Sequence, residues 1–392
     1  MKKVKDLLKN NLVLGILIGG VLFGSIGIVI ATSIESEAIL YSNEANENVT
    51  TVEEALNDLY NRAPSTQNFK SSTITLNNIK LNFYNTDDYE VTSDYLSTFS
   101  TGIYYHDGDS TTDAGDLSYR YFGQNPNNWV CFGYSDVSSC SEETFNEESE
   151  YAYRIIGFFN KNFEDSNLEP EYQIKLIKAD WATTAQLGTG QNSGDDNFSW
   201  TGSNQNNSNT WSVSTLNTIA LNDYYINTYL AGNNTIWSTM IDQQHVWKVG
   251  GNTLANIAQK EAKTAYMNEI VNPVTNFTSD NKIEDTFAVG LMYVSDYLYS
   301  FTPTFWNNKA DSLSDYTGYT WLFNSSKIEY FLTRRSDFTY YYHVFMIYTY
   351  GNVAGTDNWT YRGVRPTFYL KSNVKLKSGT GTVSDPYIIS YN

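Results

Sequence analysis

Basic residues are scarce in this chain. Its 392 residues include 25 lysines and arginines against 43 acidic residues, which gives a formal net charge of −18. No basic stripe offsets that charge, so the surface would repel a phosphate backbone. Nucleic acid is therefore excluded as a partner.

Histidines and known catalytic motifs are also few. The three histidines, His106, His245 and His343, are widely separated and do not form the H-x-x-x-E-x-H spacing of an iron site. The sequence has no G-x-S-x-G elbow, Walker loop, H-E-x-x-H motif or G-x-G-x-x-G fingerprint. We therefore predict that the protein is not an enzyme. A secreted hydrolase with two carboxylates is the alternative, because such acids meet in space and leave no spacing in the sequence.

Cysteine is limited to Cys131 and Cys140, which are nine residues apart. In an oxidising compartment, a local disulfide is the prediction for such a pair. A metal site is the alternative, but two thiols without a neighbouring histidine provide too few ligands for zinc.

Aromatic residues, by contrast, are abundant: 9 Trp, 32 Tyr and 20 Phe make up 16% of the chain. A chain with so many aromatic side chains can bury enough apolar surface to fold. We therefore expect a folded protein with a sizeable core.

One long apolar run lies near the N-terminus. Residues 1–10 carry four lysines, and the stretch from Leu12 to Ala31 has no charge and would be about 30 Å long as a helix. No basic residue follows until Arg62, so the positive-inside rule places residues 1–10 in the cytosol. We predict a single-pass anchor in the cell membrane at 11–33, with the rest of the chain extracellular. The alternative is a signal peptide cleaved at Ala31-Thr32-Ser33.

An acidic linker and a short helical stalk are predicted at 34–69. Thr51 and Glu54 have the spacing of a capping box at the start of the helix, and Pro64 ends it. A helix this short is marginal alone in water, so it needs a partner, either the ectodomain or the stalk of another copy in a homo-oligomer. The apolar residues that would face this partner recur at spacings of three and four: Val49, Val52, Leu56 and Leu59.

The order of elements in the ectodomain indicates its fold class. Two runs rich in β-branched and aromatic residues, Tyr153–Phe159 and Tyr172–Ala179, predict a hairpin. Two helical patterns follow, one after Ser214 and one from Leu254 to Ile270, and only loops and strands are expected after them. Strands, then helices, then strands again indicate an α+β fold with mostly antiparallel strands.

Eight segments follow one another through the ectodomain: DLSYRYFGQNPNNWVCFG, YAYRIIGFF, TFAVGLMYVSDYLYS, WLFNSS, YFLTRRSD, VFMIYTYGNV, RGVRPTFYLKSNVKL and GTGTVSDPYII. In this order they resemble a large group of uncharacterised membrane-anchored surface proteins of Gram-positive gut bacteria. The C-terminal part of that group resembles the formylglycine-generating-enzyme and C-type-lectin-like fold, which ends in a Gly-aromatic-Arg strand. Gly363-Val364-Arg365 stands in that place, with valine for the aromatic residue.

This resemblance implies a β-rich part at 70–150 and a lectin-like α+β domain at 151–392. It also implies that Arg365 has a structural role, in which its planar guanidinium would hold a loop if the side chain is buried. The oxidase activity of the fold is not carried over, because it needs a cysteine pair and no cysteine follows Cys140.

An acidic loop is the candidate metal site. Asp107, Asp109, Asp113 and Asp116 are spaced by two, four and three residues, with glycines between them. Hard oxygen ligands at such spacings suit Ca²⁺, which needs six to eight of them. An acidic turn without a metal ion is the alternative.

Three tryptophans are candidate ligand-binding residues. Trp306, Trp321 and Trp359 lie in the loop-rich region where lectin-like folds bind, and aromatic faces stack on sugar rings. A core position is the alternative for each. The predicted function is thus an extracellular, membrane-anchored module that binds a glycan or another cell-surface ligand, or mediates adhesion. The rival prediction is a structural protein of the cell envelope that assembles through its stalk.

Overall fold

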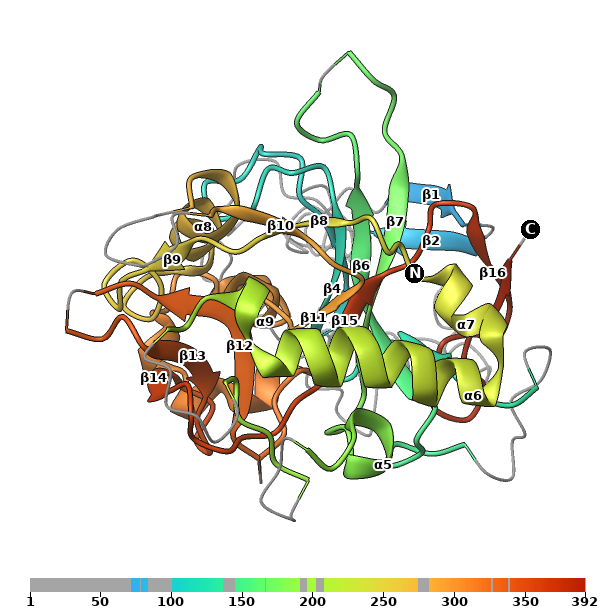
Figure 1. The fold of residues 1–392 in the computed structure, drawn as a ribbon. Helices are drawn as coiled ribbons and strands as arrows, with labels where there is room; N and C mark the ends of the chain where they lie inside the picture. Colours follow the sequence, from blue (N-terminus) through green and yellow to red (C-terminus); the bar gives the residue numbers. More distant parts are fainter. Residues whose placement is uncertain are drawn as a thin grey trace, which may run out of the picture. The chain divides into compact units, whose positions relative to one another are not determined.

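The segments richest in β-branched and aromatic residues pair into one antiparallel sheet (Figure 1). In the computed structural model, the strand order of this sheet is β11-β15-β7-β6-β4-β3, and β5 pairs with β6 beside β4. The strands are β3 (Thr101–Tyr105), β4 (Tyr119–Gly123), β5 (Trp129–Cys131), β6 (Ala152–Asn160), β7 (Tyr172–Lys178), β11 (Val289–Gly290) and β15 (Thr367–Tyr369).

The hairpin predicted from the two aromatic runs is confirmed. β6 and β7 pair antiparallel along their length, and most of their side chains are buried. The register shifts beside Gly157, where a Cβ atom would lie 2.4 Å from the carbonyl oxygen of Tyr119 in β4. Glycine is therefore required for β4 to approach β6 this closely.

The described residues are 72–77, 79–83, 101–136, 145–165, 167–190, 196–201, 208–273, 282–325, 327–337 and 339–391. They all belong to one compact unit, Phe69–Asn392, and strands from both sides of residue 150 share the main sheet. Within these ranges, no helix is long and apolar enough to cross a membrane. The predicted anchor at 11–33 and the predicted stalk helix lie outside the described residues.

Smaller sheets flank the main one. β12 (Glu329–Arg335) pairs antiparallel with β13 (His343–Ile347) and parallel with β9 (Gly251–Asn252), and β13 also pairs with β14 (Val353–Asp357). Three antiparallel pairs complete the described strands: β1 (Ser72–Leu76) with β2 (Ile79–Phe83), β8 (Val246–Lys248) with β10 (Glu284–Thr286), and β16 (Val374–Ser378) with β17 (Ile388–Tyr391).

One long helix, η3 (Leu216–Leu230), packs against β11, as the pattern after Ser214 predicts (Figure 1). Its hydrogen bonds follow the wider π-helical pattern. The shorter helices are α5 (Thr184–Leu187), η2 (Trp211–Val213), α6 (Ala231–Asn233), α7 (Thr235–Met240), α8 (Ala262–Tyr266), η4 (Met267–Val271), α9 (Val294–Tyr299), η5 (Pro303–Phe305), η6 (Ala310–Ser312) and η7 (Ser314–Tyr319). The described part of the chain is therefore α+β, with mostly antiparallel strands.

Two sequence-based predictions of helices were wrong. The helix predicted from Leu254 begins only at Ala262, because the residues before it form turns that bury Ile257 and Ala258 without helical geometry. The prediction of only loops and strands after Ile270 missed α9. Every residue of α9 is buried, so its sequence has no polar face and no helical period to detect.

Candidate functional site

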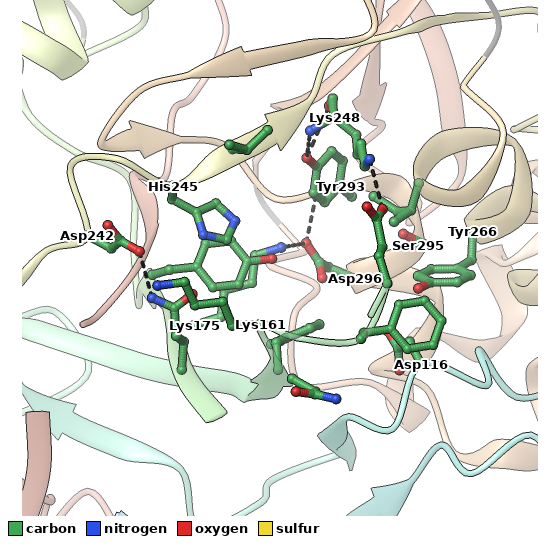
Figure 2. Close-up of a pocket in the computed structure, with 18 of the residues that line it drawn as sticks. Asp116, Lys161, Lys175, Asp242, His245, Lys248, Tyr266, Tyr293, Ser295 and Asp296 are labelled. Carbon is green, nitrogen blue, oxygen red and sulfur yellow. Dashed lines mark hydrogen bonds and ion pairs between the residues drawn. The ribbon is translucent and has the colours of Figure 1, made fainter. Parts of the chain in front are cut away.

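A cavity of about 490 Å³ lies between the main sheet, the β8–β10 pair and the helices α8, η4 and α9 (Figure 2). This volume is typical of a small-molecule site. Among the described residues that line it, only Val246 and Ile270 are aliphatic. The rest are charged, aromatic or carry an amide, imidazole or hydroxyl: Asp116, Arg120, Phe159, Asn160, Lys161, Phe163, Glu164, Gln173, Lys175, Asp242, Gln244, His245, Lys248, Tyr266, Glu284, Tyr293, Ser295, Asp296 and Tyr369.

A buried ion pair lies at the floor of this cavity. Lys175 in β7 places its Nζ atom 2.6 Å from Oδ2 of Asp296 in α9, and both side chains are almost completely buried. The same oxygen accepts the backbone N–H of Tyr293 at 2.8 Å, in the capping box that starts α9. Burial lowers the pKa of Lys175. The floor therefore holds an ammonium group whose charged form is disfavoured by burial.

A second buried pair, Asp116 and Arg120, lies beside the first. Asp116 accepts from the Arg120 guanidinium and, at 2.5 Å, from the hydroxyl of Ser118. The guanidinium also faces the rings of Phe159 and Tyr299, whose centroids lie 4.8 and 4.9 Å from its central carbon. The carboxylate of Asp116 and the guanidinium of Arg120 thus bind each other. The groups at the rim of the cavity come from other residues.

His245 and Tyr369 form an aromatic pair on the wall. Their ring centroids are 3.7 Å apart and their planes differ by 16°. Burial lowers the pKa of His245 to about 3, so the imidazole is uncharged at neutral pH. Beside this pair, Asp242 accepts a hydrogen bond of 2.7 Å from the amide of Gln173 (Figure 2). This wall therefore combines flat ring faces with an anionic carboxylate.

The rim carries exposed polar groups. Lys161, Glu164 and Gln244 are exposed, and Lys248 pairs with Glu164 at 3.0 Å and with Glu284 at 2.5 Å. A ligand entering the cavity would thus meet hydrogen-bond donors and acceptors of both charge signs at the mouth.

The buried side chain of Glu269 binds the first turn of α9. Oε1 of Glu269 in η4 accepts the backbone N–H of Val294 at 3.0 Å, and Oε2 accepts that of Ser295 at 2.9 Å. The hydroxyl of Thr333 donates to the same carboxyl group. Burial raises the pKa of Glu269 to about 7. Glu269 fixes the first turn of the helix that carries Asp296.

The three candidate tryptophans are not among the residues that line the cavity. Trp306 and Trp321 are buried, and their indole N–H groups donate to the carbonyl oxygens of Phe301 at 2.9 Å and Tyr121 at 3.0 Å. Both therefore occupy the core positions that the sequence left as their alternative. Trp359 is half-buried, and its ring stacks on Tyr342 with the centroids 5.0 Å apart.

The structure places the four candidate calcium ligands in one loop but gives most of them local partners. Asp113 accepts the N–H of Gly108 at 3.1 Å, Asp107 accepts that of Asp109 at 3.1 Å, and Asp116 binds Arg120. Among the described residues, no group of three or more His, Cys, Asp or Glu side chains could hold a metal ion. Calcium binding stays a prediction.

Arg365 is buried, and the planar fork of its guanidinium binds Glu329 in β12. Its Nε and Nη2 atoms donate to the two carboxylate oxygens of Glu329 at 2.5 and 2.6 Å, and Nη2 also donates to the carbonyl of Leu322 at 2.7 Å.

Cys131 ends β5 and is buried, whereas Cys140 lies outside the described residues, so the disulfide stays a prediction.

Sequence reasoning missed the floor of the cavity altogether. The available signal was a charge inside an apolar segment: Lys175 in YQIKLIKA and Asp296 in VSDYLY. Lysine and aspartate are almost never fully buried unless they are paired. Each of these charges therefore predicts a buried partner, but the sequence does not indicate which one.

Comparison of the chain with protein-family models, with curated proteins and with solved structures gives no match in any of the three.

Proposed function

We propose that the unit Phe69–Asn392 is a binding module that takes a carbohydrate in the cavity above Lys175 and Asp296. The observation that carries this proposal is the stacked His245–Tyr369 pair beside Gln244, Asp242 and other polar groups. Sugars present C–H faces to aromatic rings and hydroxyl groups to amides and carboxylates. A lining with so few aliphatic side chains is a poor match for a lipid.

The contacts of the acids favour binding over glycoside hydrolysis. A glycosidase needs one carboxyl group that is protonated and can donate its proton to the leaving group. The described carboxylates of this cavity face cations or an amide: Asp116 faces Arg120, Asp296 faces Lys175, Glu164 and Glu284 face Lys248, and Asp242 faces Gln173. These carboxylates already accept hydrogen bonds or ion-pair contacts from neighbouring groups, a role that suits recognition better than general-acid catalysis.

The module is best understood as the extracellular part of a membrane-anchored surface protein with a C-type-lectin-like fold, similar to the surface proteins of Gram-positive gut bacteria. The charge pattern around 11–33 supports the anchor. The antiparallel sheet, and Arg365 two residues before β15, support the lectin-like interpretation.

Calorimetric titration of the full chain with a panel of soluble oligosaccharides, including peptidoglycan fragments, tests this function. For a glycan that binds, His245→Ala should weaken the affinity about fivefold, because a stacked aromatic contact contributes about 1 kcal/mol. Gln244→Ala should weaken it by a smaller factor.

Gln243→Ala is the matched control. Gln243 and Gln244 are adjacent and both exposed, but Gln243 donates to the carbonyl of Ser238 and does not line the cavity. Its removal should leave the affinity unchanged. The proposal fails if no oligosaccharide binds, or if a bound glycan has the same affinity for the wild type and for folded His245→Ala protein.

A further inference from the structure

The pair of Lys175 and Asp296 differs from the other lysine–carboxylate pairs of the described chain. The two residues are 121 positions apart in sequence, and their side chains are 0% and 2% exposed. In the other such pairs within the described ranges, at least one side chain is 30% exposed or more: Lys248 with Glu164 and Glu284, Lys282 with Asp285, and Lys327 with Asp180. Among the lysine–carboxylate pairs of the described residues, only the pair at the cavity floor has both side chains almost completely buried.

Aromatic rings surround the ammonium group. The ring centroids of Phe159, Trp247, Tyr293 and Tyr369 lie 4.6–5.5 Å from Nζ of Lys175. Removing two opposite charges from water carries a large desolvation penalty, and the contact with Asp296 and the cation–π contacts offset only part of it, since burial still lowers the pKa of Lys175. A neutral group that joined the same two side chains would carry no such penalty.

We propose that Lys175 and Asp296 condense spontaneously into an intramolecular isopeptide bond. The proton of the ammonium group passes to the carboxylate, which leaves a neutral amine and a carboxylic acid. The amine nitrogen then forms a bond to Cγ of Asp296, and the C–O bond to the carboxyl hydroxyl breaks. That oxygen leaves as water with one further proton from the nitrogen. Ammonium plus carboxylate gives amide plus water, so no oxidant, nucleotide or other reactant is needed.

Several contacts of the described residues favour this step. Nζ of Lys175 is held 2.6 Å from Oδ2 of Asp296 (Figure 2), and well-oriented intramolecular groups react far faster than free ones. The backbone N–H of Tyr293 donates to Oδ2 at 2.8 Å and so fixes the orientation of the carboxyl group beside the amine. Burial lowers the pKa of Lys175, which favours the nucleophilic amine. Both residues line the cavity, so the released water has an exit.

The bond would join β7 of the main sheet to α9 across the floor of the cavity. It would link two segments far apart in the chain without a cysteine, and it would persist after unfolding. This consequence is independent of which ligand the cavity binds.

The mass of the denatured, reduced full chain tests the proposal. We expect the wild type to be lighter than its sequence by the mass of one water molecule, and Lys175→Arg to lack this deficit. Proteolysis of the wild type should release a branched peptide that contains both Lys175 and Asp296. Lys282→Arg removes a lysine that pairs with Asp285 at 2.5 Å in an exposed position, so this control should retain the deficit.

Asp296→Asn provides a second test that does not depend on the folding of the Lys175 variant. Lysine can also condense with asparagine, which releases ammonia and gives the same amide. The linked wild type and the linked Asp296→Asn protein should therefore have identical masses, although their unlinked sequences differ.

Two results would overturn the proposal. In the first, the wild type has its full mass, and the peptides of β7 and α9 are recovered separately and unmodified, which would make the pair an ordinary ion pair. In the second, the loss of water is confined to a linear peptide that contains Asp296, which would indicate a succinimide at that residue.

Discussion

Two buried ion pairs of this protein differ in how their charges are satisfied. Arg365 meets both oxygens of Glu329 and a backbone carbonyl, so its guanidinium makes three hydrogen bonds. Lys175 meets one oxygen of Asp296, and four aromatic rings surround the rest of its ammonium group. A fork whose Nε and Nη2 donors are matched by a carboxylate and a carbonyl makes a fixed support. A lysine that meets one carboxylate oxygen compensates the two buried charges less completely, and burial lowers its pKa.

The largest effect should come from breaking the fork. Arg365→Lys keeps the charge but loses the paired geometry, and it leaves a buried carboxylate and a carbonyl without their donors. Breaking a buried pair in this way costs about 3–5 kcal/mol. Chemical denaturation of both proteins, followed by circular dichroism, measures the difference.

Arg362→Lys is the matched control, because Arg362 is half-buried and donates to the carbonyl of Tyr361 and to the hydroxyl of Thr356. It should cost less than 1 kcal/mol, as is usual for partly exposed charges. Equal losses of stability in the two variants would show that the paired geometry of Arg365 contributes no more than the contacts of a half-buried arginine.

A smaller effect should come from Glu269, a buried carboxyl group whose hydrogen-bond donors are neutral. Burial raises its pKa to about 7, above the ordinary glutamate value of 4.5, so the folded state binds more protons than the unfolded state between these pH values. Stability should therefore fall as the pH rises from about 4.5 to 7, by about 3 kcal/mol at ~1.4 kcal/mol per pH unit.

Glu269→Gln should flatten this pH dependence, and denaturation curves at a series of pH values measure it. Glu169→Gln, at an exposed position, should leave the slope as in the wild type. If the slope persists in folded Glu269→Gln protein, the titrating group lies elsewhere.

The smallest effect concerns the predicted disulfide between residues nine positions apart, which contrasts with the long-range link proposed between β7 and α9. Cys131→Ser should lower the stability by about 2–3 kcal/mol, since a bridge across a short loop restricts the unfolded chain only modestly. A reducing agent should lower the stability of the wild type by the same amount and leave the variant unchanged. Free thiols in the native wild type would contradict the bridge.

Local patterns in the sequence predicted the local parts of the fold. The β6–β7 hairpin and the helix after Ser214 follow from runs of β-branched and aromatic residues and from helical spacing, which near neighbours set. α9 could not be found in this way, because it is buried on every side. The same limit applied to Trp306 and Trp321: an aromatic residue in a loop-rich segment has the same sequence pattern whether its ring is buried or exposed.

By itself, the sequence determines the charge balance, the apolar run at Leu12–Ala31 and the α+β class of the fold, because each depends on composition or on near neighbours. Only the tertiary structure decided that Lys175 meets Asp296, that Arg365 meets Glu329 and that a cavity lies above the first pair. A buried charge requires a partner, but its partner can lie anywhere along the chain. The pairing of the strands and the docking of α9 are what bring these side chains together.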